Sequence, residues 1–154
     1  MPAAPTPTSR SEPIRVVVDT REQLPYSFDP AHVTTVRRAL PAGDYSVEGY
    51  ESAMAIERKS LEDFVASAIS HRERFGRELR LLAEYDFGCI VVEGSLRDVL
   101  LHTYRCGAHP RAVFGALLSI IVDHRVPVFF CDDRQAACRF VEGLLLRYHR
   151  GTQG

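Results

Sequence analysis

The chain's single lysine lies two residues after a glutamate, in the segment Ile56-Glu57-Arg58-Lys59. Of nineteen Lys and Arg residues only Lys59 is a lysine, so it is a candidate for a role that needs a compact ammonium rather than a guanidinium. Residues two apart on a strand share one face, which would place Glu57 beside Lys59. Such a pair suits holding a metal ion and a phosphate next to an activated water. The alternative is that codon bias has replaced most lysines by arginine and that Lys59 remains by chance.

A predicted β-hairpin brings a second carboxylate to this pair. Apolar and polar residues alternate over 43–48 and again over 53–59, and residues 49–52 between them have the composition of a hairpin loop. This alternation predicts two antiparallel strands.

The apolar residues specify the register of this hairpin. Two pairs keep them on one face: Tyr45 with Ile56 and Val47 with Met54. The same register places Asp44 opposite Glu57 on the other face, together with Lys59. Directly paired residues have Cβ atoms roughly 5 Å apart, close enough for two carboxylates to share a divalent ion. A one-residue slip would expose Met54 and Ile56, so the register is strongly specified.

Four acidic residues are predicted near strand ends: Asp19, Glu22, Asp44 and Glu57. The first two follow the apolar run 14–18. Carboxylates with one lysine suit magnesium-dependent phosphodiester hydrolysis, because Mg²⁺ prefers oxygen ligands and keeps waters, one of which can be the nucleophile. A lysine can orient or deprotonate that water.

Each of these residues also has a structural explanation. The explanations are solvation of a strand end for Asp19 and Glu22, a turn for Asp44, a helix cap for Asp63, and an exposed ion pair for Glu57 and Lys59. Convergence on one predicted face favours the chemical interpretation.

Taken in order, these motifs resemble the nuclease domain of the XPF family of structure-specific endonucleases. The family signature is Gly-Asp, a variable spacer, Glu-Arg-Lys, three residues and Asp. The matching segments are Asp19-Thr20-Arg21-Glu22, Gly43-Asp44, Glu57-Arg58-Lys59 and Asp63, with Arg74-Phe75 and Val92-Glu93-Gly94 as further landmarks. The similarity covers roughly residues 14–148, and the full set of motifs in the right order is far more specific than a short motif alone.

The resemblance implies an α/β fold of the restriction-endonuclease (PD-(D/E)XK) type, a three-layer sandwich with a central mixed β-sheet flanked by helices. It implies cleavage of branched DNA, such as flaps and forks, in repair or recombination, with Mg²⁺ as cofactor and Mn²⁺ as a substitute. The implied catalytic residues are Asp19, Glu22, Asp44, Glu57 and Lys59, with Asp19, Asp44 and Glu57 as metal ligands and Arg21, Arg58 and Asp63 in support.

Family members usually carry a tandem helix-hairpin-helix module after the nuclease domain, and none follows here before Gly154. We therefore expect phosphate contacts from four arginines of one predicted helix: Arg72, Arg74, Arg77 and Arg80. A solvated helix face laced with glutamates is the alternative. The resemblance also implies a homodimer or heterodimer through the apolar stripes of 113–121 and 137–148, for which an ordinary core is the alternative.

Two other functions stay open. One is a catalytically silent DNA-binding or scaffold partner of a nuclease, although such subunits typically lose the acidic residues or the lysine that this chain retains. The other is a less selective, restriction-type nuclease. A zinc site at His102, Cys106 and His109 lacks a fourth ligand and paired spacing, so these residues are predicted to lie in a loop.

The elements expected to position these residues alternate between strands and helices. They are strands at 14–18, 32–40, 43–48, 53–59, 89–94 and 126–131, and helices at 61–69 (capped by Ser60), from Ser70 to about Tyr85, at 113–121 and at 137–148, with a short helix and loop over 95–110. This order predicts one α/β domain.

Length and composition fit that single domain. The chain has 154 residues, 45% hydrophobic and 25% charged, and we expect a domain over 13–149 between a disordered tail at 1–12 and a tail at 150–154. A net charge of −1 requires any DNA-binding patch to be local. No apolar run is long enough to span a membrane and no signal peptide is visible, so we expect a cytoplasmic, nucleoid-associated or nuclear protein that is not secreted.

Overall fold

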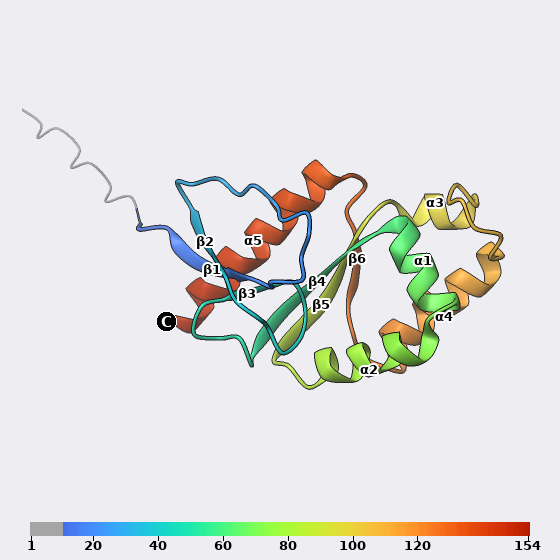
Figure 1. Ribbon diagram of the computed structural model, residues 1–154, viewed down its shortest axis with the longest axis horizontal. Coiled ribbons are helices and arrows are strands. Elements are labelled where there is room, and N and C mark those ends of the chain that lie inside the picture. Colours follow the sequence, from blue (N-terminus) through green and yellow to red (C-terminus); the bar gives the residue numbers. More distant parts are fainter. Residues whose placement is uncertain (1–10) are drawn as a thin grey trace, which may run out of the picture.

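A computed structural model describes residues 11–154, which form a six-stranded mixed sheet in the order β2-β1-β3-β4-β5-β6 (Figure 1). The strands are β1 (Ile14–Val18), β2 (Val33–Arg37), β3 (Tyr45–Val47), β4 (Met54–Ser60), β5 (Phe87–Glu93) and β6 (Val128–Phe130). Only β3 runs antiparallel to its neighbours. The other five strands therefore bring their carboxyl ends to the same edge of the sheet.

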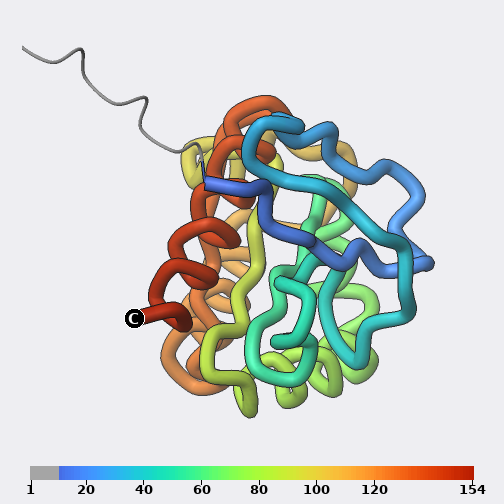
Figure 2. The backbone as a smooth tube through the Cα atoms, turned by 90° about the vertical axis from the view of Figure 1, so that its left-hand side faces the viewer, coloured from blue at the N-terminus to red at the C-terminus, as the bar shows by residue number. Residues whose placement is uncertain are grey.

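Five helices cover the two faces of this sheet. They are α1 (Leu61–Ile69), α2 (Arg72–Ala83), α3 (Leu96–Leu100), α4 (Pro110–Val122) and α5 (Arg134–Thr152). In Figure 1, α5 lies on one side of the sheet and α1, α2 and α4 lie on the other. Figure 2 shows the β1 and β2 segments (blue) beside the β3–β4 hairpin (blue-green), with α5 (red) alongside. The predicted three-layer α/β sandwich is confirmed.

The sheet separates two hydrophobic cores, and strand parity decides which core each residue enters. Ala55 of β4 and Ile90 of β5 pack under α1, α2 and α4, whereas Ile56 and Cys89, each one residue away, pack under α5. Because β4 and β5 are buried on both faces, each reads as an apolar run at its start.

The predicted hairpin register is confirmed where the structure pairs Tyr45 with Ile56. The four apolar residues of the hairpin are all fully buried in the core under α5: Tyr45, Val47, Met54 and Ile56. The opposite face of this hairpin therefore carries Asp44, Glu57 and Lys59, as the parity requires.

Several predicted boundaries differ from the structure. The expected capping box at Ser70 is wrong: Ser70 ends α1 by donating its N–H to Ala66, and α2 begins after His71 without a side-chain cap. The helix predicted over 137–148 extends from Arg134 to Thr152, so most of the expected 150–154 tail is helical. Most of the disordered tail expected at 1–12 lies outside the described residues.

No helix within residues 11–154 combines the length and the apolar character that crossing a membrane requires.

Candidate active site

Asp44 is held between two strands just before β3 begins. Its N–H donates to the Ile56 carbonyl at 2.8 Å, and its carbonyl accepts from the Asp19 N–H at 2.8 Å. The preceding Gly43 has φ +74°, and a Cβ added there would lie 3.1 Å from both the Ala55 Cβ and the Ile56 oxygen. The Gly-Asp pair thus lets the backbone approach β4 closely enough to present the Asp44 carboxylate.

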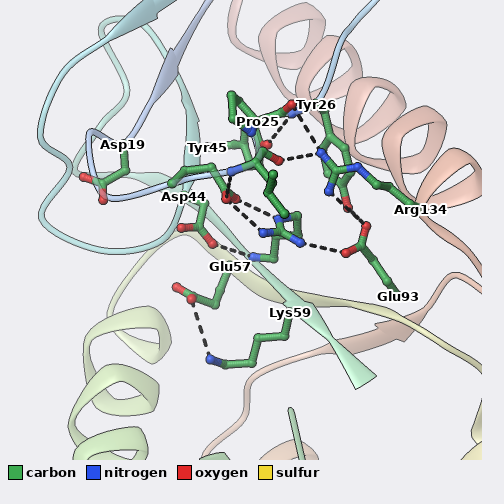
Figure 3. Close-up of polar contacts among 12 residues, drawn as sticks. Asp19, Pro25, Tyr26, Asp44, Tyr45, Glu57, Lys59, Glu93 and Arg134 are labelled. Carbon is green, nitrogen blue, oxygen red and sulfur yellow. Dashed lines mark hydrogen bonds and ion pairs between the residues drawn. The ribbon is translucent and has the colours of Figure 1, made fainter. Parts of the chain in front are cut away.

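Glu57 and Lys59 project from the face of β4 that α1 and α2 cover. Lys59 Nζ lies 3.8 Å from Glu57 Oε1, and both side chains are largely buried. The same ammonium lies 5.2 Å from the centroid of the Phe75 ring on α2. Figure 3 shows the carboxylates of Asp44 and Glu57 next to each other, with the Lys59 ammonium reaching toward Glu57. The structure therefore brings these three predicted residues together.

A pocket of about 260 Å³ opens onto this pair of carboxylates. Its acidic lining residues are Asp19, Asp44, Glu57 and Glu78, and α2 contributes Leu81 and Leu82. The pocket joins the end of β1, the Gly-Asp turn, β4 and α2, so four separate segments of the chain meet at one concave, negatively charged site.

Burial and proximity change the acidity of the two carboxylates. Burial, followed by the charge of Glu22, raises the pKa of Asp44 to about 6, against the lowering effect of the Arg58 N–H. Burial and then the charge of Asp44 raise the pKa of Glu57 to about 8, although Lys59 opposes the shift. Both carboxyls therefore resist ionisation because water is scarce, and Glu57 does so also because Asp44 is close.

The donor set fits a hard divalent cation. Two adjacent buried carboxylates that repel one another gain from a cation between them, and their oxygens are the ligands that Mg²⁺ and Mn²⁺ take. Within residues 11–154 no three His, Cys, Asp or Glu side chains lie close enough to hold one metal ion. Binding by one or two carboxylates with water and substrate phosphate is the usual arrangement for Mg²⁺.

Asp19 lines the same pocket, but its oxygens already have partners. Oδ2 accepts from Arg21 Nε at 2.7 Å, and Oδ1 accepts from the Leu40 N–H at 2.7 Å. Although burial opposes it, these hydrogen bonds hold the pKa of Asp19 below its ordinary value. Asp19 therefore lines the pocket as a carboxylate that ionises more readily than usual, and Arg21 holds it in place.

Glu22 lies on the other face of β4, with Arg58. Its oxygens accept from Arg58 Nε at 2.7 Å and Nη2 at 2.9 Å, while Arg58 Nη1 donates to Glu93 at 2.7 Å. Burial opposes ionisation of Glu22, but the Arg58 bonds keep its pKa lowered. The Arg58 backbone N–H donates to Asp44 Oδ2 at 2.7 Å. Glu22 and the Arg58 side chain therefore lie across β4 from the site and are connected to it through this hydrogen bond.

The remaining predicted residues lie further out. Asp63 is exposed, and its backbone N–H donates to the Ser60 hydroxyl that caps α1. The four arginines predicted to bind DNA all lie on α2, outside the core: Arg72, Arg74, Arg77 and Arg80. Two of them, Arg72 and Arg80, line a different pocket, between α2 and α4.

The segment considered for zinc is a loop with other contacts. A ring nitrogen of His102 bonds the Cys106 carbonyl, and His109 caps α4 by accepting from the Arg111 N–H.

The sequence analysis assigned no site role to three residues around the site, although it named Glu93 as a landmark of the family. Glu78 lines the pocket, Glu93 anchors Arg58, and Arg134 contacts Glu93 at 3.4 Å. Glu93 ends a buried strand, a position at which a polar residue is a signal for a site. Glu78 and Arg134 carry no such signal, because only tertiary packing turns their helices toward the site.

Comparisons with known sequences find a matching family and relatives of this chain. The model of the ERCC4 domain matches residues 18–144. The chain is 28% identical over 141 residues to the 3'-flap repair endonuclease Xpf of Saccharolobus solfataricus, an alignment that covers 90% of this chain and 57% of that protein. It is 31% identical over 124 residues to the putative ATP-dependent RNA helicase MJ1505 of Methanocaldococcus jannaschii, covering 80% and 14% respectively.

Solved structures show the same fold. XPF from Aeropyrum pernix superposes with a TM-score of 0.69 at 27% identity, covering 88% of this chain and 65% of that chain. The same protein in complex with DNA gives a TM-score of 0.68 at 25% identity, covering 90% and 66%. The chain thus spans 57% of the length of the Saccharolobus relative and 65% of the length of the Aeropyrum structure.

Proposed function

The chain belongs to the ERCC4 domain family of XPF-type nuclease domains, and from this premise we propose that it is a divalent-metal-dependent DNA endonuclease. The proposed reaction is hydrolysis of phosphodiester bonds in branched DNA, such as flaps and forks, during repair or recombination. Mg²⁺ is the proposed cofactor, with Mn²⁺ as a substitute.

The observation that carries this proposal is the pair of buried carboxylates, Asp44 and Glu57, with the ammonium of Lys59 beside them. Two adjacent acids whose pKa values are raised by burial, and for Glu57 also by the charge of Asp44, cost folding stability when both are ionised. A fold that keeps them side by side in an open pocket is best explained by a cation that both of them bind.

In this proposal Asp44 and Glu57 hold the metal, which when bound lowers the pKa of water and neutralises charge on the phosphate. Asp19 keeps the pocket negative, because its carboxylate stays ionised. As an ammonium, Lys59 orients the attacking water and adds positive charge beside the phosphate; as a neutral amine it would instead accept the proton of that water. Phe75 and Glu57 hold the Lys59 ammonium in place for that role.

The relatives support DNA as the substrate. One is named as a 3'-flap repair endonuclease, and one structural neighbour was solved with DNA. We extend that substrate class to this chain and propose that arginines of α2 contact the phosphates.

We also propose that two chains pair at the β6 edge of the sheet. This strand ends the sheet and lies between α4 and α5, the two helices expected to pair. Exposed apolar side chains gather on these helices: Leu118, Ile121, Val122 and Phe140. Exposed apolar surface beside an unpaired sheet edge is a site for association.

A cleavage assay tests the proposed activity. Labelled flap, fork and linear duplex DNA are incubated with the protein in Mg²⁺ or Mn²⁺, beside Asp44→Asn and Lys59→Ala. We expect cleavage of flaps or forks by the wild type and loss of cleavage in both variants. Binding of DNA without cleavage in either metal would favour a silent scaffold instead. Equal cleavage of linear duplex would keep the nuclease and discard its selectivity for branched DNA.

A further inference from the structure

A chain of ion pairs connects the first residue of α5 to β4. Asp133 caps the helix by accepting from the Ala136 N–H, which makes Arg134 its first residue. Arg134 Nη1 lies 3.4 Å from Glu93 Oε2, and the other oxygen of Glu93 lies 2.7 Å from Arg58 Nη1. One carboxylate therefore joins Arg58 of β4 and Arg134 of α5. Figure 3 shows Glu93 beside Arg134.

Arg134 also holds the loop that follows β1. Its Nη2 donates to the carbonyl oxygens of Leu24 and Pro25, and its guanidinium lies 4.7 Å from the centroid of the Tyr26 ring. A guanidinium can make all these contacts at once because its five N–H groups form a rigid plane. The loop that carries Glu22 is thus fixed to the start of α5.

Both branches of this network end at Asp44. In the first, Glu22 and Glu93 fix the Arg58 side chain, and the Arg58 N–H donates to Asp44 Oδ2 at 2.7 Å. In the second, the Tyr26 N–H donates to the hydroxyl of Tyr45, the residue next to Asp44, at 2.8 Å. The orientation of the Asp44 carboxylate therefore depends on the loop and on Arg58.

We propose that Arg134 is a positioning residue for the cleavage reaction. By fixing the loop over residues 22–26 and the Glu93 carboxylate, it holds Arg58 and Tyr45, and through them the Asp44 carboxylate. This inference rests on the proposed function, because its consequence is a faster chemical step.

A purely structural role would predict that removing Arg134 lowers the stability of the whole fold. The Arg134 side chain is 44% exposed, and exposed ion pairs contribute little to stability. Its removal should therefore leave the global fold intact while loosening the loop, Arg58 and Asp44.

The test compares Arg134→Ala with Arg139→Ala, which removes the same charge from another position on the same helix. We expect Arg134→Ala to lower kcat about 10- to 100-fold, as removal of an outer positioning group does, with KM for flap DNA changed by less than about twofold. Arg139→Ala should match the wild type in both constants. Arg134→Lys keeps the charge but not the planar fork, so its kcat should fall between those of the wild type and Arg134→Ala.

A second readout does not depend on activity. We expect hydrogen exchange of the Arg58 amide to accelerate in Arg134→Ala, with an unchanged urea midpoint, because Asp44 Oδ2 accepts that hydrogen bond. Wild-type kcat in Arg134→Lys and Arg134→Ala, or unchanged exchange at Arg58, would overturn the proposal. If the wild type cuts no DNA, the proposed function fails, and the exchange at Arg58 still decides whether Arg134 positions Asp44. If Arg134→Ala does not fold, Arg134→Lys decides in its place.

Discussion

At the scale of the residue, Lys59 is enclosed by two different neighbours. Glu57 lies 3.8 Å from its ammonium and the Phe75 ring centroid lies 5.2 Å away, and only 12% of the Lys59 side chain is exposed. A guanidinium is larger and planar and never deprotonates. An arginine here would keep the charge without the compact group that orients or deprotonates water.

Lys59→Arg should therefore lower the cleavage rate about 100-fold or more, the range expected when a general acid–base group is removed, while the protein stays folded. Single-turnover cleavage of flap DNA measures the rate, and circular dichroism measures the fold. Arg97→Lys, at an exposed position on α3, is the reverse exchange and should retain most of the activity. An active Lys59→Arg protein would show that the reaction does not need a lysine at this position.

A second prediction at this scale concerns the acidity of Glu57. Burial and the charge of Asp44 raise the pKa of Glu57 from 4.5 to about 8. Between these values the folded chain keeps a proton that the unfolded chain has released. The stability that this carboxyl contributes is therefore full below about pH 4.5 and is lost as pH rises toward 8.

Urea unfolding with chelator should show a free energy of unfolding that falls by on the order of 4 kcal/mol between about pH 5 and about pH 9. Glu57→Gln should flatten this slope, because an amide does not ionise, whereas Glu84→Gln on the exposed end of α2 should not. Mg²⁺ should stabilise the wild type at about pH 8 more than it stabilises Glu57→Gln. A Glu57→Gln protein with the same pH slope as the wild type would contradict the assignment.

At the scale of the element, the turn before β3 positions Asp44 through a glycine. Gly43 has φ +74° and little room for a Cβ, which would lie 3.1 Å from the Ala55 Cβ and the Ile56 oxygen. Gly49 at the tip of the hairpin has φ +91° but nothing within 4 Å of an added Cβ. A side chain would therefore strain the backbone at both positions, but it would be crowded by neighbouring atoms only at Gly43.

Gly49→Ala should lower the free energy of unfolding by about 1 kcal/mol from strain alone. Gly43→Ala should lower it further and also slow cleavage, because the turn must shift and Asp44 with it. Urea unfolding and flap cleavage of both variants provide the comparison. Equal losses of stability with normal cleavage would show that the turn tolerates a side chain.

Helix α2 divides its four arginines between two surfaces. Arg74 and Arg77 lie on the side of the helix that carries Glu78 and Leu81, which line the site pocket, because residues three and four apart share a side. Arg72 and Arg80 instead line the pocket between α2 and α4. Arg74 and Arg77 are therefore nearer the side of α2 that carries the site pocket, and together with Arg72 they also line a pocket at the start of the helix.

Replacing Arg74 and Arg77 with alanine should weaken DNA binding and reduce the slope of log K against log salt by about one for each phosphate that the variant no longer neutralises. The matched double variant of Arg72 and Arg80 removes the same charge and should change the slope less. Fluorescence anisotropy at several salt concentrations, with Ca²⁺ in place of Mg²⁺ to prevent cleavage, measures both. Equal slopes for the two variants would contradict this division of the helix.

At the scale of the whole molecule, sequence patterns predicted those features of the fold that depend only on residues close together in the chain. The alternation around Tyr45 and Ile56 was sufficient for the hairpin register and for the shared face of Asp44, Glu57 and Lys59, because side-chain parity is a local property. The position of Glu22 was not predictable in this way. Its pairing with Arg58, 36 residues away, depends on how the loop after β1 folds back over β4.

We expect a partner chain to bind at the β6 edge of the sheet. Val122 is 69% exposed at the end of α4, and Phe140 is 37% exposed on α5, where its ring centroid lies 5.1 Å from that of Phe129 in β6. Burying this surface in a dimer would remove apolar area from water. We therefore expect the protein to be dimeric at micromolar concentration.

Phe140→Glu should shift the mass measured by light scattering toward the monomer, because a charge in an apolar interface loses its hydration without gaining a partner. Leu101→Glu, at an exposed leucine after α3, should leave the dimer unchanged. Circular dichroism must show both variants folded. A wild type that is monomeric at these concentrations would refute pairing, whereas a Phe140→Glu protein that stays dimeric would move the interface away from the β6 edge.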